Sequence, residues 1–182
     1  MEQDNNYPLF VQVKTKAEED TFVKIYSDLC LERGVTFEPK ESKNCIRFLM
    51  VDENNDSIGT IEVLPYIPKE ETNLEYYYPF ADHPSVKNIQ ERSTVFELGK
   101  MAITENKRNQ GFLSKFVDFM FRFSKKYKVD YFVCAMNVEI YRILLLKHKI
   151  VFEKLDKKIN FGQYGTYPVI IDMKASSERS SN

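Results

Sequence analysis

The sequence predicts a three-layer α+β fold, in which helices flank both faces of a central β-sheet. Residues 129–136 are an almost continuous apolar run, as expected of a central strand that is buried on both faces. Residues 109–127 instead place Phe116 and Phe123 on one apolar face at helical spacing. The chain has 182 residues, of which 43% are hydrophobic and 29% charged. This length and composition are typical of one globular domain with a substantial core, which we expect over residues 1–174.

The first third of the chain alternates between strand and helix patterns. Residues 8–14 alternate apolar and polar side chains and are rich in β-formers, which predicts a first strand. Residues 17–33 carry apolar side chains at helical spacing, and Gly34 supplies a stop. Residues 45–51 and 57–64 are predicted strands joined by a polar turn, so they are expected to form a hairpin.

A long irregular segment follows this hairpin. Residues 65–92 contain four prolines and an aromatic patch that runs from Tyr76 to Phe80. A loop of this length inside a compact domain is often functional. The patch is therefore expected either to border a substrate pocket or to anchor the loop by packing. A short helix is predicted over residues 84–90.

The second half of the chain supplies the remaining strands and the longest helix. Residues 94–103 predict a strand that leads through a basic turn into the helix over residues 109–127. A further helix is predicted over residues 139–148, and closing strands are predicted over residues 151–159 and 167–174. Residues 175–182 are rich in serine and are predicted to form a disordered tail.

Composition excludes several classes of protein. The formal net charge of −1 gives no reason to expect nonspecific nucleic-acid binding. The three cysteines, Cys30, Cys45 and Cys134, lie far apart and no Cys/His cluster exists, so neither a disulfide framework nor a metal site is expected. No apolar run approaches the roughly 20 residues that span a bilayer. No signal peptide is visible either, so we expect a cytoplasmic protein.

The turn before the 109–127 helix has the properties of a phosphate site. A helix N-terminus presents unpaired backbone N–H groups and the positive end of the helix dipole, which together bind phosphate. Lys107 and Arg108 add positive charge, and Gly111 allows the backbone to approach an anion closely. The turn is therefore a candidate cradle for a diphosphate.

The same turn carries a recognisable motif, Arg108-Asn109-Gln110-Gly111-Phe112-Leu113. It resembles the Arg/Gln-x-x-Gly-x-Gly/Ala motif of the GNAT acyltransferases, from which Leu113 departs at the last position. The order of predicted strands and helices resembles the GNAT fold over nearly the whole chain. The resemblance implies a mixed, mostly antiparallel sheet of six to seven strands. It also implies transfer of an acyl group from acetyl-CoA or another acyl-CoA, with no metal.

The resemblance also assigns residues to the donor. In GNAT proteins the fourth strand parts from its neighbour, the pantetheine arm pairs in the gap, and a backbone N–H there polarises the thioester carbonyl. The expected donor-binding residues are Met101, Ala102, Ile103, Lys107, Arg108, Asn109, Gln110, Gly111, Phe112, Leu113 and Asn137. For Asn137, which precedes a helix, capping of that helix is the alternative role.

Three further patches resemble one branch of the superfamily. The segments 97–103, 141–146 and 164–168 are similar to the autoinducer synthases and N-acyl amino acid synthases. Members of that branch often take long acyl chains from acyl carrier protein. The resemblance therefore implies acyl carrier protein as an alternative donor and partner. Arg122 and the lysines that follow it could bind such an acidic protein, and the alternative is that they form a solvated helix end.

Glu97 is the candidate general base. It lies on a strand among apolar neighbours, and burial disfavours the charged form of a carboxylate, which suits a group that must accept a proton. It also matches a glutamate that recurs in the autoinducer-synthase branch. The alternative role for Glu97 is an ion pair with Lys100 or another neighbour. Tyr141 is the candidate general acid, although its place in the first turn of a helix is equally consistent with simple packing.

Three functions follow from these residues. The first is a CoA-dependent N-acyltransferase that acts on a small amine or amino acid. The second is an enzyme of the same fold that uses acyl carrier protein. The third is a non-catalytic sensor that binds acyl-CoA, and it predicts that Glu97 is held in a salt bridge and that no acceptor pocket opens beside the thioester. The sequence leaves the oligomeric state, monomer or dimer, open.

Overall fold

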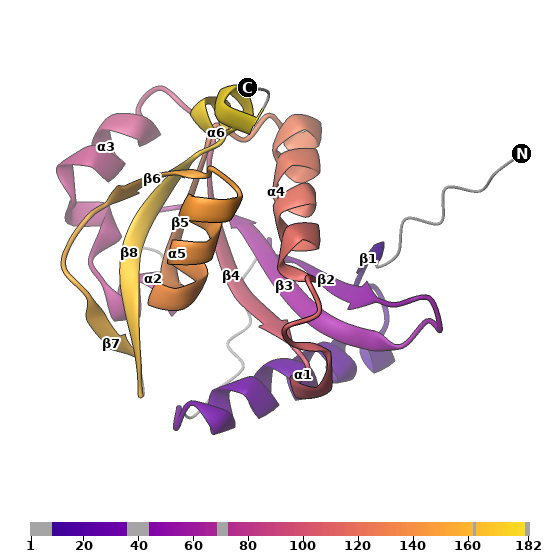
Figure 1. Ribbon diagram of the computed structural model, residues 1–182. Coiled ribbons are helices and arrows are strands. Elements are labelled where there is room, and N and C mark those ends of the chain that lie inside the picture. Colours follow the sequence, from indigo (N-terminus) through magenta and orange to yellow (C-terminus); the bar gives the residue numbers. More distant parts are fainter. Residues whose placement is uncertain (1–8, 36–43, 69–72, 162, 181–182) are drawn as a thin grey trace, which may run out of the picture.

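The computed structural model describes residues 9–35, 44–68, 73–161 and 163–180. Its centre is a twisted sheet of eight strands in the order β1-β2-β3-β4-β5-β8-β6, with β7 also paired to β8 (Figure 1). Every pair is antiparallel except β4–β5, which is parallel. The strands are β1 (Leu9–Gln12), β2 (Ile46–Val51), β3 (Ser57–Pro65), β4 (Val95–Ile103), β5 (Tyr131–Asn137), β6 (Val151–Lys154), β7 (Ile159–Phe161) and β8 (Tyr164–Asp172).

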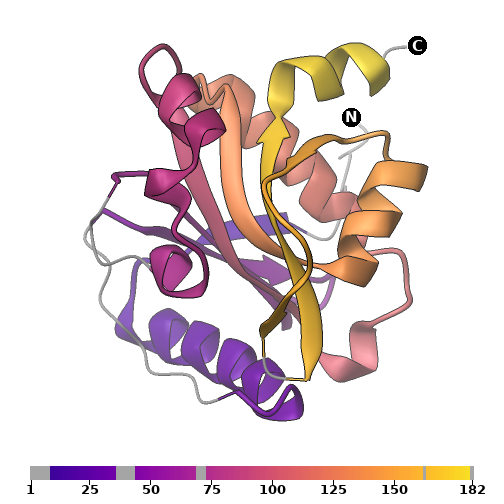
Figure 2. The same cartoon turned by 90° about the vertical axis from the view of Figure 1, so that its left-hand side faces the viewer.

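Within the described residues, six α-helices and two short 3-10 helices surround this sheet. The α-helices are α1 (Lys16–Glu32), α2 (Asn73–Tyr77), α3 (Pro84–Gln90), α4 (Leu113–Tyr127), α5 (Val138–Lys147) and α6 (Met173–Ser180), and the 3-10 helices are η1 (Phe80–Asp82) and η2 (Glu105–Lys107). Helices α1, α2 and α3 cover one face of the sheet, and α4 and α5 cover the other (Figure 2). The predicted three-layer fold and mostly antiparallel sheet are confirmed.

The core is split between the two faces. On the face under α4, the helix buries Phe116, Phe119 and Phe123, as its periodicity predicts. Rings from the sheet meet this stripe, with the Phe10 and Phe116 centroids 5.3 Å apart and those of Phe48 and Phe119 4.9 Å apart. Such edge and tilted contacts add to the free energy gained by apolar burial. This packing fixes α4 against the sheet. The candidate phosphate turn leads directly into the N-terminus of this helix.

Helix α1 begins and ends where its sequence directs. Thr15 and Glu18 form a capping box, in which each side chain accepts a hydrogen bond from the backbone N–H of the other residue. At the other end Gly34 adopts a positive φ of 67° and donates its N–H to the carbonyl of Leu31. These caps fix the length of α1, which decides which of its residues reach the functional site described below.

Two predictions about the C-terminal part of the chain were wrong. The strand predicted over residues 151–159 is divided into β6 and β7, because the polar residues 156–158 form a turn, and the sheet has eight strands rather than six or seven. The tail predicted to be disordered is helical as far as Ser180, and residues 181–182 lie outside the described residues. Ser176 is fully buried in this helix and its Oγ accepts the backbone N–H of Val151 at 2.9 Å. This contact with β6 holds α6 in place.

Candidate active site

The two central strands part in the middle of the sheet. β4 and β5 pair only over Val95–Glu97 and Tyr131–Val133. Beyond Glu97, β4 continues along β3, whereas β5 continues along β8. The strand edges that face each other across the parting therefore carry backbone groups outside the β4–β5 ladder. A linear molecule with amide groups could pair with such an edge.

A β-bulge in β4 lies at this parting. Gly99 pairs with Glu62 and Ala102 pairs with Thr60, so Lys100 and Met101 together oppose a single residue of β3. Lys100 has a positive φ of 46°, and its carbonyl accepts a hydrogen bond from Thr60 Oγ1 at 2.8 Å. A bulge of this kind leaves a backbone N–H of its strand outside the ladder. That is the type of donor that could stabilise an oxyanion.

A pocket of about 460 Å³ opens at the parting. Most of its wall comes from the C-terminal half of α1, helix α2, and the diverging ends of β4 and β5. Single residues of β3, α5 and β8 complete it: Glu62, Ile140 and Thr166. Glu97 lies on this wall and is only 6% exposed. A Cβ added at the neighbouring Gly99 would meet only Glu97 Oε1, at 3.9 Å, so the two residues share one face of β4. The absent side chain of Gly99 thus leaves room beside the carboxylate.

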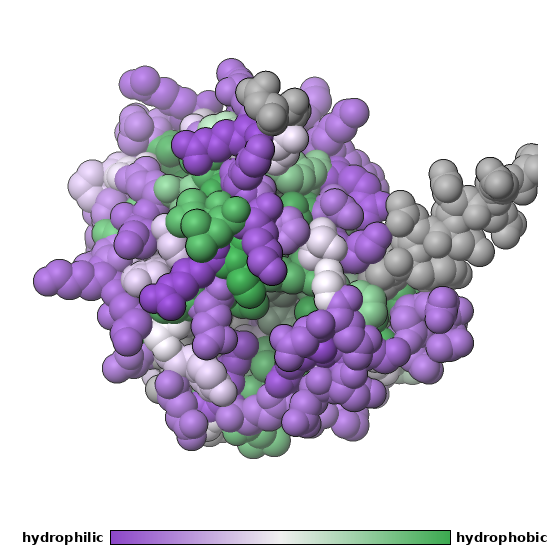
Figure 3. All heavy atoms as spheres, viewed as in Figure 1, coloured by the Kyte–Doolittle hydropathy of each residue, from purple (hydrophilic) through white to green (hydrophobic). Residues whose placement is uncertain are grey.

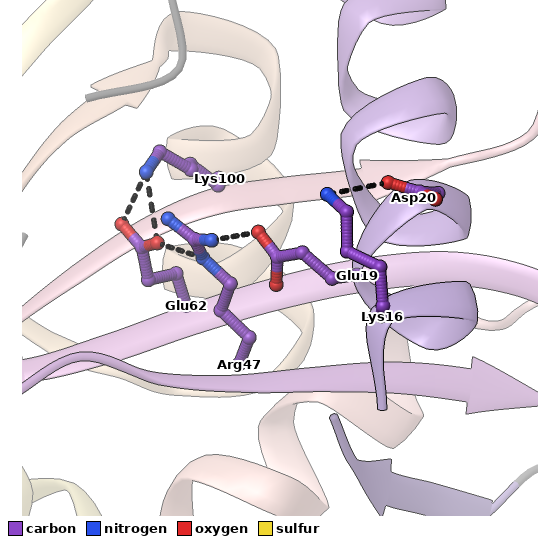
Figure 4. A network of polar contacts seen from close by, with 6 residues as sticks. All are labelled: Lys16, Glu19, Asp20, Arg47, Glu62 and Lys100. Atoms are coloured by element: carbon purple, nitrogen blue, oxygen red, sulfur yellow. Dashed lines mark hydrogen bonds and ion pairs between the residues drawn. The ribbon is translucent and has the colours of Figure 1, made fainter. Parts of the chain in front are cut away.

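A network of charges, buried at Glu62 and Lys100 and partly exposed at Arg47 and Glu19, runs along the same face of the sheet (Figure 4). Lys100 Nζ lies 2.7 Å from Glu62 Oε1, and Arg47 Nε lies 2.6 Å from Glu62 Oε2. Arg47 also pairs with Glu19 of α1. Because Glu62 and Lys100 both line the pocket, this network ties the pocket wall to β2 and α1. Lys100, which the sequence offered as a partner for Glu97, thus forms an ion pair with Glu62.

The polar groups of the pocket differ in what they can do chemically. Burial raises the pKa of the Cys30 and Cys134 thiols, so both stay protonated and neither is a ready nucleophile. Burial also raises the pKa of Tyr77 to about 12, which keeps its hydroxyl neutral. The pocket therefore holds two buried carboxylates, Glu97 at the strand parting and Glu62 beside it, together with the cations Arg33 and Lys100. Its two thiols and the Tyr77 hydroxyl stay neutral, so neither cysteine is a nucleophile that could carry an acyl group.

The candidate phosphate turn lies outside the pocket lining in the described part of the chain. Asn109 and Gly111 both adopt positive φ values, 60° and 82°. A Cβ added at Gly111 would meet nothing within 4 Å, so the turn has open space in front of it. Its two cations are paired: Lys107 Nζ lies 2.8 Å from Asp52 Oδ2, and Arg108 forms a two-pronged ion pair with Glu32, at 2.7 and 3.0 Å.

The structure separates the predicted site residues into groups. Three of them line the pocket: Glu97, Met101 and Asn137. Ala102 is buried, at 3% exposure, and Ile103 packs against the core beneath α4. The predicted turn residues are Lys107, Arg108, Asn109, Gln110, Gly111, Phe112 and Leu113; they form the connection from η2 to the start of α4.

Asn137 and Tyr141 have clear structural roles. Asn137 Oδ1 accepts the backbone N–H groups of Glu139 at 2.8 Å and Ile140 at 3.3 Å, so it caps α5. The ring of Tyr141 packs 4.8 Å from that of Phe152 and 5.2 Å from that of Tyr167. Packing was one of the two roles that the sequence suggested for Tyr141, beside that of general acid. In the described part of the chain, Glu97 lines the pocket, whereas Tyr141 is not among the lining residues.

Several pocket residues were missed from sequence. Tyr26, Cys30 and Arg33 stand at i, i+4 and i+7 of α1 and form one face of that helix toward the pocket. Glu62 is 2% exposed and is the one charged residue of strand β3. A charge in the middle of a strand buried on both faces was a detectable signal, because such a charge requires a partner.

The described residues contain no group of three or more His, Cys, Asp or Glu side chains that could hold a metal ion. In the same residues, every helix is too short or too polar to cross a membrane.

Comparisons with known proteins show the fold but no close relative. No protein-family model matches the sequence, and no curated protein matches it either. Among solved structures, the chain is similar to FeeM, an N-acyl amino acid synthase from uncultured soil microbes, with a TM-score of 0.73 at 12% identity over 94% of each chain. It is also similar to the AHL synthase LasI, with a TM-score of 0.71 at 12% identity over 95% of this chain and 94% of the other.

A third likeness connects the chain to an acetyltransferase. Spermidine N-acetyltransferase from Vibrio cholerae, solved in complex with CoA and spermine, gives a TM-score of 0.61 at 12% identity, over 95% of this chain and 99% of the other. Identities this low carry information about architecture alone. The three likenesses confirm the GNAT fold that the sequence predicts.

Proposed function

We propose that this chain is an N-acyltransferase that moves an acyl group from a CoA thioester to the amine of a small acceptor. The observation that carries the proposal is the pocket at the parting of β4 and β5, with the buried carboxylate of Glu97 on its wall. Acyl transfer to an amine needs an open strand edge for the donor, a base, and room for an acceptor. The parting offers a strand edge, a buried carboxylate and a pocket at one place, which supports the proposal.

The donor is proposed to lie along the free edge of β4. Its pantetheine amides pair with Met101, Ala102 and Ile103, which follow the bulge. Its phosphates sit in front of the turn at the start of α4, where Gly111 leaves open space and the positive end of the helix dipole lies. The thioester carbonyl then lies beside the bulge, whose N–H supports the oxyanion.

The proposed chemistry uses Glu97 as the base. The acceptor nitrogen attacks the thioester carbonyl carbon and forms the new C–N bond, while Glu97 accepts the proton that the nitrogen loses. The C–S bond then breaks, and the thiolate takes up a proton from Glu97, directly or through water. The products are an amide and a free thiol, and Glu97 returns to its starting state. Tyr141 has no step in this scheme because it packs against Phe152 and Tyr167.

The charges of the pocket favour an acceptor that carries both an amine and an acid. Arg33 lines the pocket from α1, across from the strands that carry Glu97. A guanidinium recognises a carboxylate through paired hydrogen bonds. An amino acid could therefore place its amine near Glu97 and its carboxylate near Arg33. A small polyamine, which lacks a carboxylate, would leave Arg33 without this contact.

The second candidate is an enzyme of the same fold that takes its acyl chain from acyl carrier protein. The surface of α5 favours it. Ile143 and Leu146 are 36% and 77% exposed there, and hydrophobic side chains gather at this place in Figure 3. Arg142 and Lys147 stand exposed beside them. An acidic protein with an apolar centre would complement this surface.

A panel of donors and acceptors tests the proposal. Purified protein is incubated with acyl-CoA of increasing chain length, or with the same acyl groups on carrier protein, and with amino acids or polyamines. Release of free thiol and the mass of the N-acyl product are measured together. We expect thiol release that depends on the acceptor, with amino acids as the better acceptors. Donor binding without transfer to any acceptor would favour the non-catalytic sensor instead.

A further inference from the structure

The ion pair between Arg108 and Glu32 has the geometry of an anion site that is already filled. Arg108 Nη1 lies 2.7 Å from Glu32 Oε2, and Nη2 lies 3.0 Å from Glu32 Oε1. The third donor of the guanidinium, Nε, gives a hydrogen bond to the carbonyl of Ile103 at 3.0 Å. This last bond anchors the guanidinium to the end of β4. Its two outer N–H groups therefore keep their direction whatever anion they hold.

A phosphate presents the same pair of oxygens as a carboxylate. Arginine binds both through two parallel N–H···O bonds. Arg108 lies in the turn where the proposed donor places its phosphates, three residues before Gly111 and its open space. Both side chains of the Arg108–Glu32 pair are about one-third exposed, at 34% and 37%. A pair this accessible contributes little to stability and can be exchanged for another anion at small cost.

Glu32 lies next to residues that line the pocket. It is the last residue of α1, and the residues around it, Cys30, Arg33 and Val35, line the pocket. The end of α1 has a second attachment, since the carbonyl of Arg33 accepts the N–H of Gln163 at 3.1 Å and its guanidinium lies 5.3 Å from the centre of the Tyr164 ring. The Arg108–Glu32 pair thus connects this wall to the phosphate turn.

We infer that Glu32 competes with the phosphate of the donor for Arg108, and that donor binding releases the end of α1 from the turn. The inference rests on the proposed function, because it takes the donor to be a phosphate-bearing thioester. Donor binding then loosens one wall of the acceptor pocket, next to Arg33. The carboxylate of Glu32 lowers donor affinity. Its release from Arg108 couples donor binding at the turn to the wall of the acceptor pocket.

A double-mutant cycle on donor affinity tests the competition. The dissociation constant of CoA is measured by calorimetry for the wild type, Glu32→Gln, Arg108→Gln and the double variant. We expect Glu32→Gln to bind CoA about two- to fivefold more tightly, the range for an exposed ion pair. In the Arg108→Gln background the same change should have no effect. The matched control Asp28→Asn removes a carboxylate one turn earlier, where it pairs with Lys24, and should leave the constant unchanged.

Hydrogen exchange tests the release of α1. The amides of Arg33, Gly34 and Val35 are bonded to carbonyls of the last helical turn. CoA should speed their exchange in the wild type, whereas Glu32→Gln should exchange fast without CoA. The inference fails if Glu32→Gln leaves CoA affinity unchanged, if it tightens binding equally in both backgrounds, or if CoA slows the exchange of these amides. If the wild type binds no CoA and no phosphopantetheine at all, the proposed function fails and this inference falls with it.

Discussion

The pocket and the phosphate turn both carry ion pairs, but the two regions are built in opposite ways. In the pocket, the side chains of Glu62 and Lys100 are 3% and 5% exposed and form one buried network with Arg47. At the turn, the Arg108–Glu32 pair is accessible to solvent. Buried charges need their partners because removal of one leaves another uncompensated. Exposed ones can exchange partners. The contrast suggests a rigid chemical centre beside an exchangeable anion site.

The largest expected effect comes from Glu97 in the pocket. Glu97→Gln keeps the shape of the side chain but cannot accept the proton of the acceptor amine. We expect turnover to fall by about 100-fold or more, the usual contribution of a general base, while the dissociation constant of CoA is unchanged. Steady-state rates and calorimetry measure the two quantities separately. Glu91→Gln, on the exposed end of α3, is the matched control. Near-normal turnover by Glu97→Gln would remove Glu97 from the mechanism.

The next effect concerns stability and separates the two kinds of ion pair directly. Glu62→Gln would leave Arg47 and Lys100 buried with one carboxylate fewer. We expect it to lower the free energy of unfolding by about 3–5 kcal/mol, as for other broken buried pairs. Glu32→Gln, the exposed counterpart, should cost less than about 1 kcal/mol. Urea unfolding of both variants measures the difference. Equal losses would show that the contrast between the two regions has no energetic basis.

A pair of glycine substitutions, one in the turn and one in the pocket, separates donor binding from turnover. Gly111→Val puts a side chain into the open space of the turn, so we expect CoA to bind at least about tenfold more weakly. Gly99→Val puts the same side chain beside Glu97, where it should slow turnover and leave CoA affinity intact. Calorimetry and rates distinguish the two. The placement of the phosphates would be contradicted if Gly111→Val bound CoA as tightly as the wild type.

The smallest expected effect is a pH dependence at the turn. Hydrogen bonding to Lys107 lowers the pKa of Asp52 in the folded state. A carboxyl with a lowered folded-state pKa stabilises the fold above its unfolded value of about 3.9, and this contribution disappears as the pH falls through the folded-state pKa. Asp52→Asn should therefore be less stable than the wild type at pH 7, and the gap should shrink below pH 4. Urea midpoints at several pH values test this. A gap that stays constant with pH would contradict it.

The fold was predictable because its signals are local. The apolar run of β5, the phenylalanine stripe of α4 and the polar turn between β2 and β3 each lie within one short segment. The helix α6 was not predictable in this way, because a serine-rich segment has weak helical preference. It is held by Ser176, which reaches β6 twenty-five residues earlier in the chain. The helical structure of α6 therefore depends on a tertiary contact rather than on the helix propensity of its residues.

The same division applies to the candidate site. Glu97 and the 107–113 turn carried local signals, namely a carboxylate among apolar neighbours and a basic turn before an amphipathic helix. The wall of the pocket joins α1 and α2 to β4 and β5, and the ion pair of Arg108 with Glu32 spans 76 residues. No pattern within a single segment reports such a pairing. From the sequence, Lys107 and Arg108 were therefore predicted to bind phosphate. Their ion pairs with Asp52 and Glu32 could not be predicted, because those partners lie far away in the chain.

The most direct test of the account is a crystal structure of the protein with bound CoA. The account predicts the sulfur atom in the gap between β4 and β5, beside Glu97 and the bulge at Lys100, with the diphosphate in front of Gly111. Glu32 should then have left Arg108. A structure with CoA bound away from this gap, or with the sulfur remote from Glu97, would contradict acyl transfer at this site.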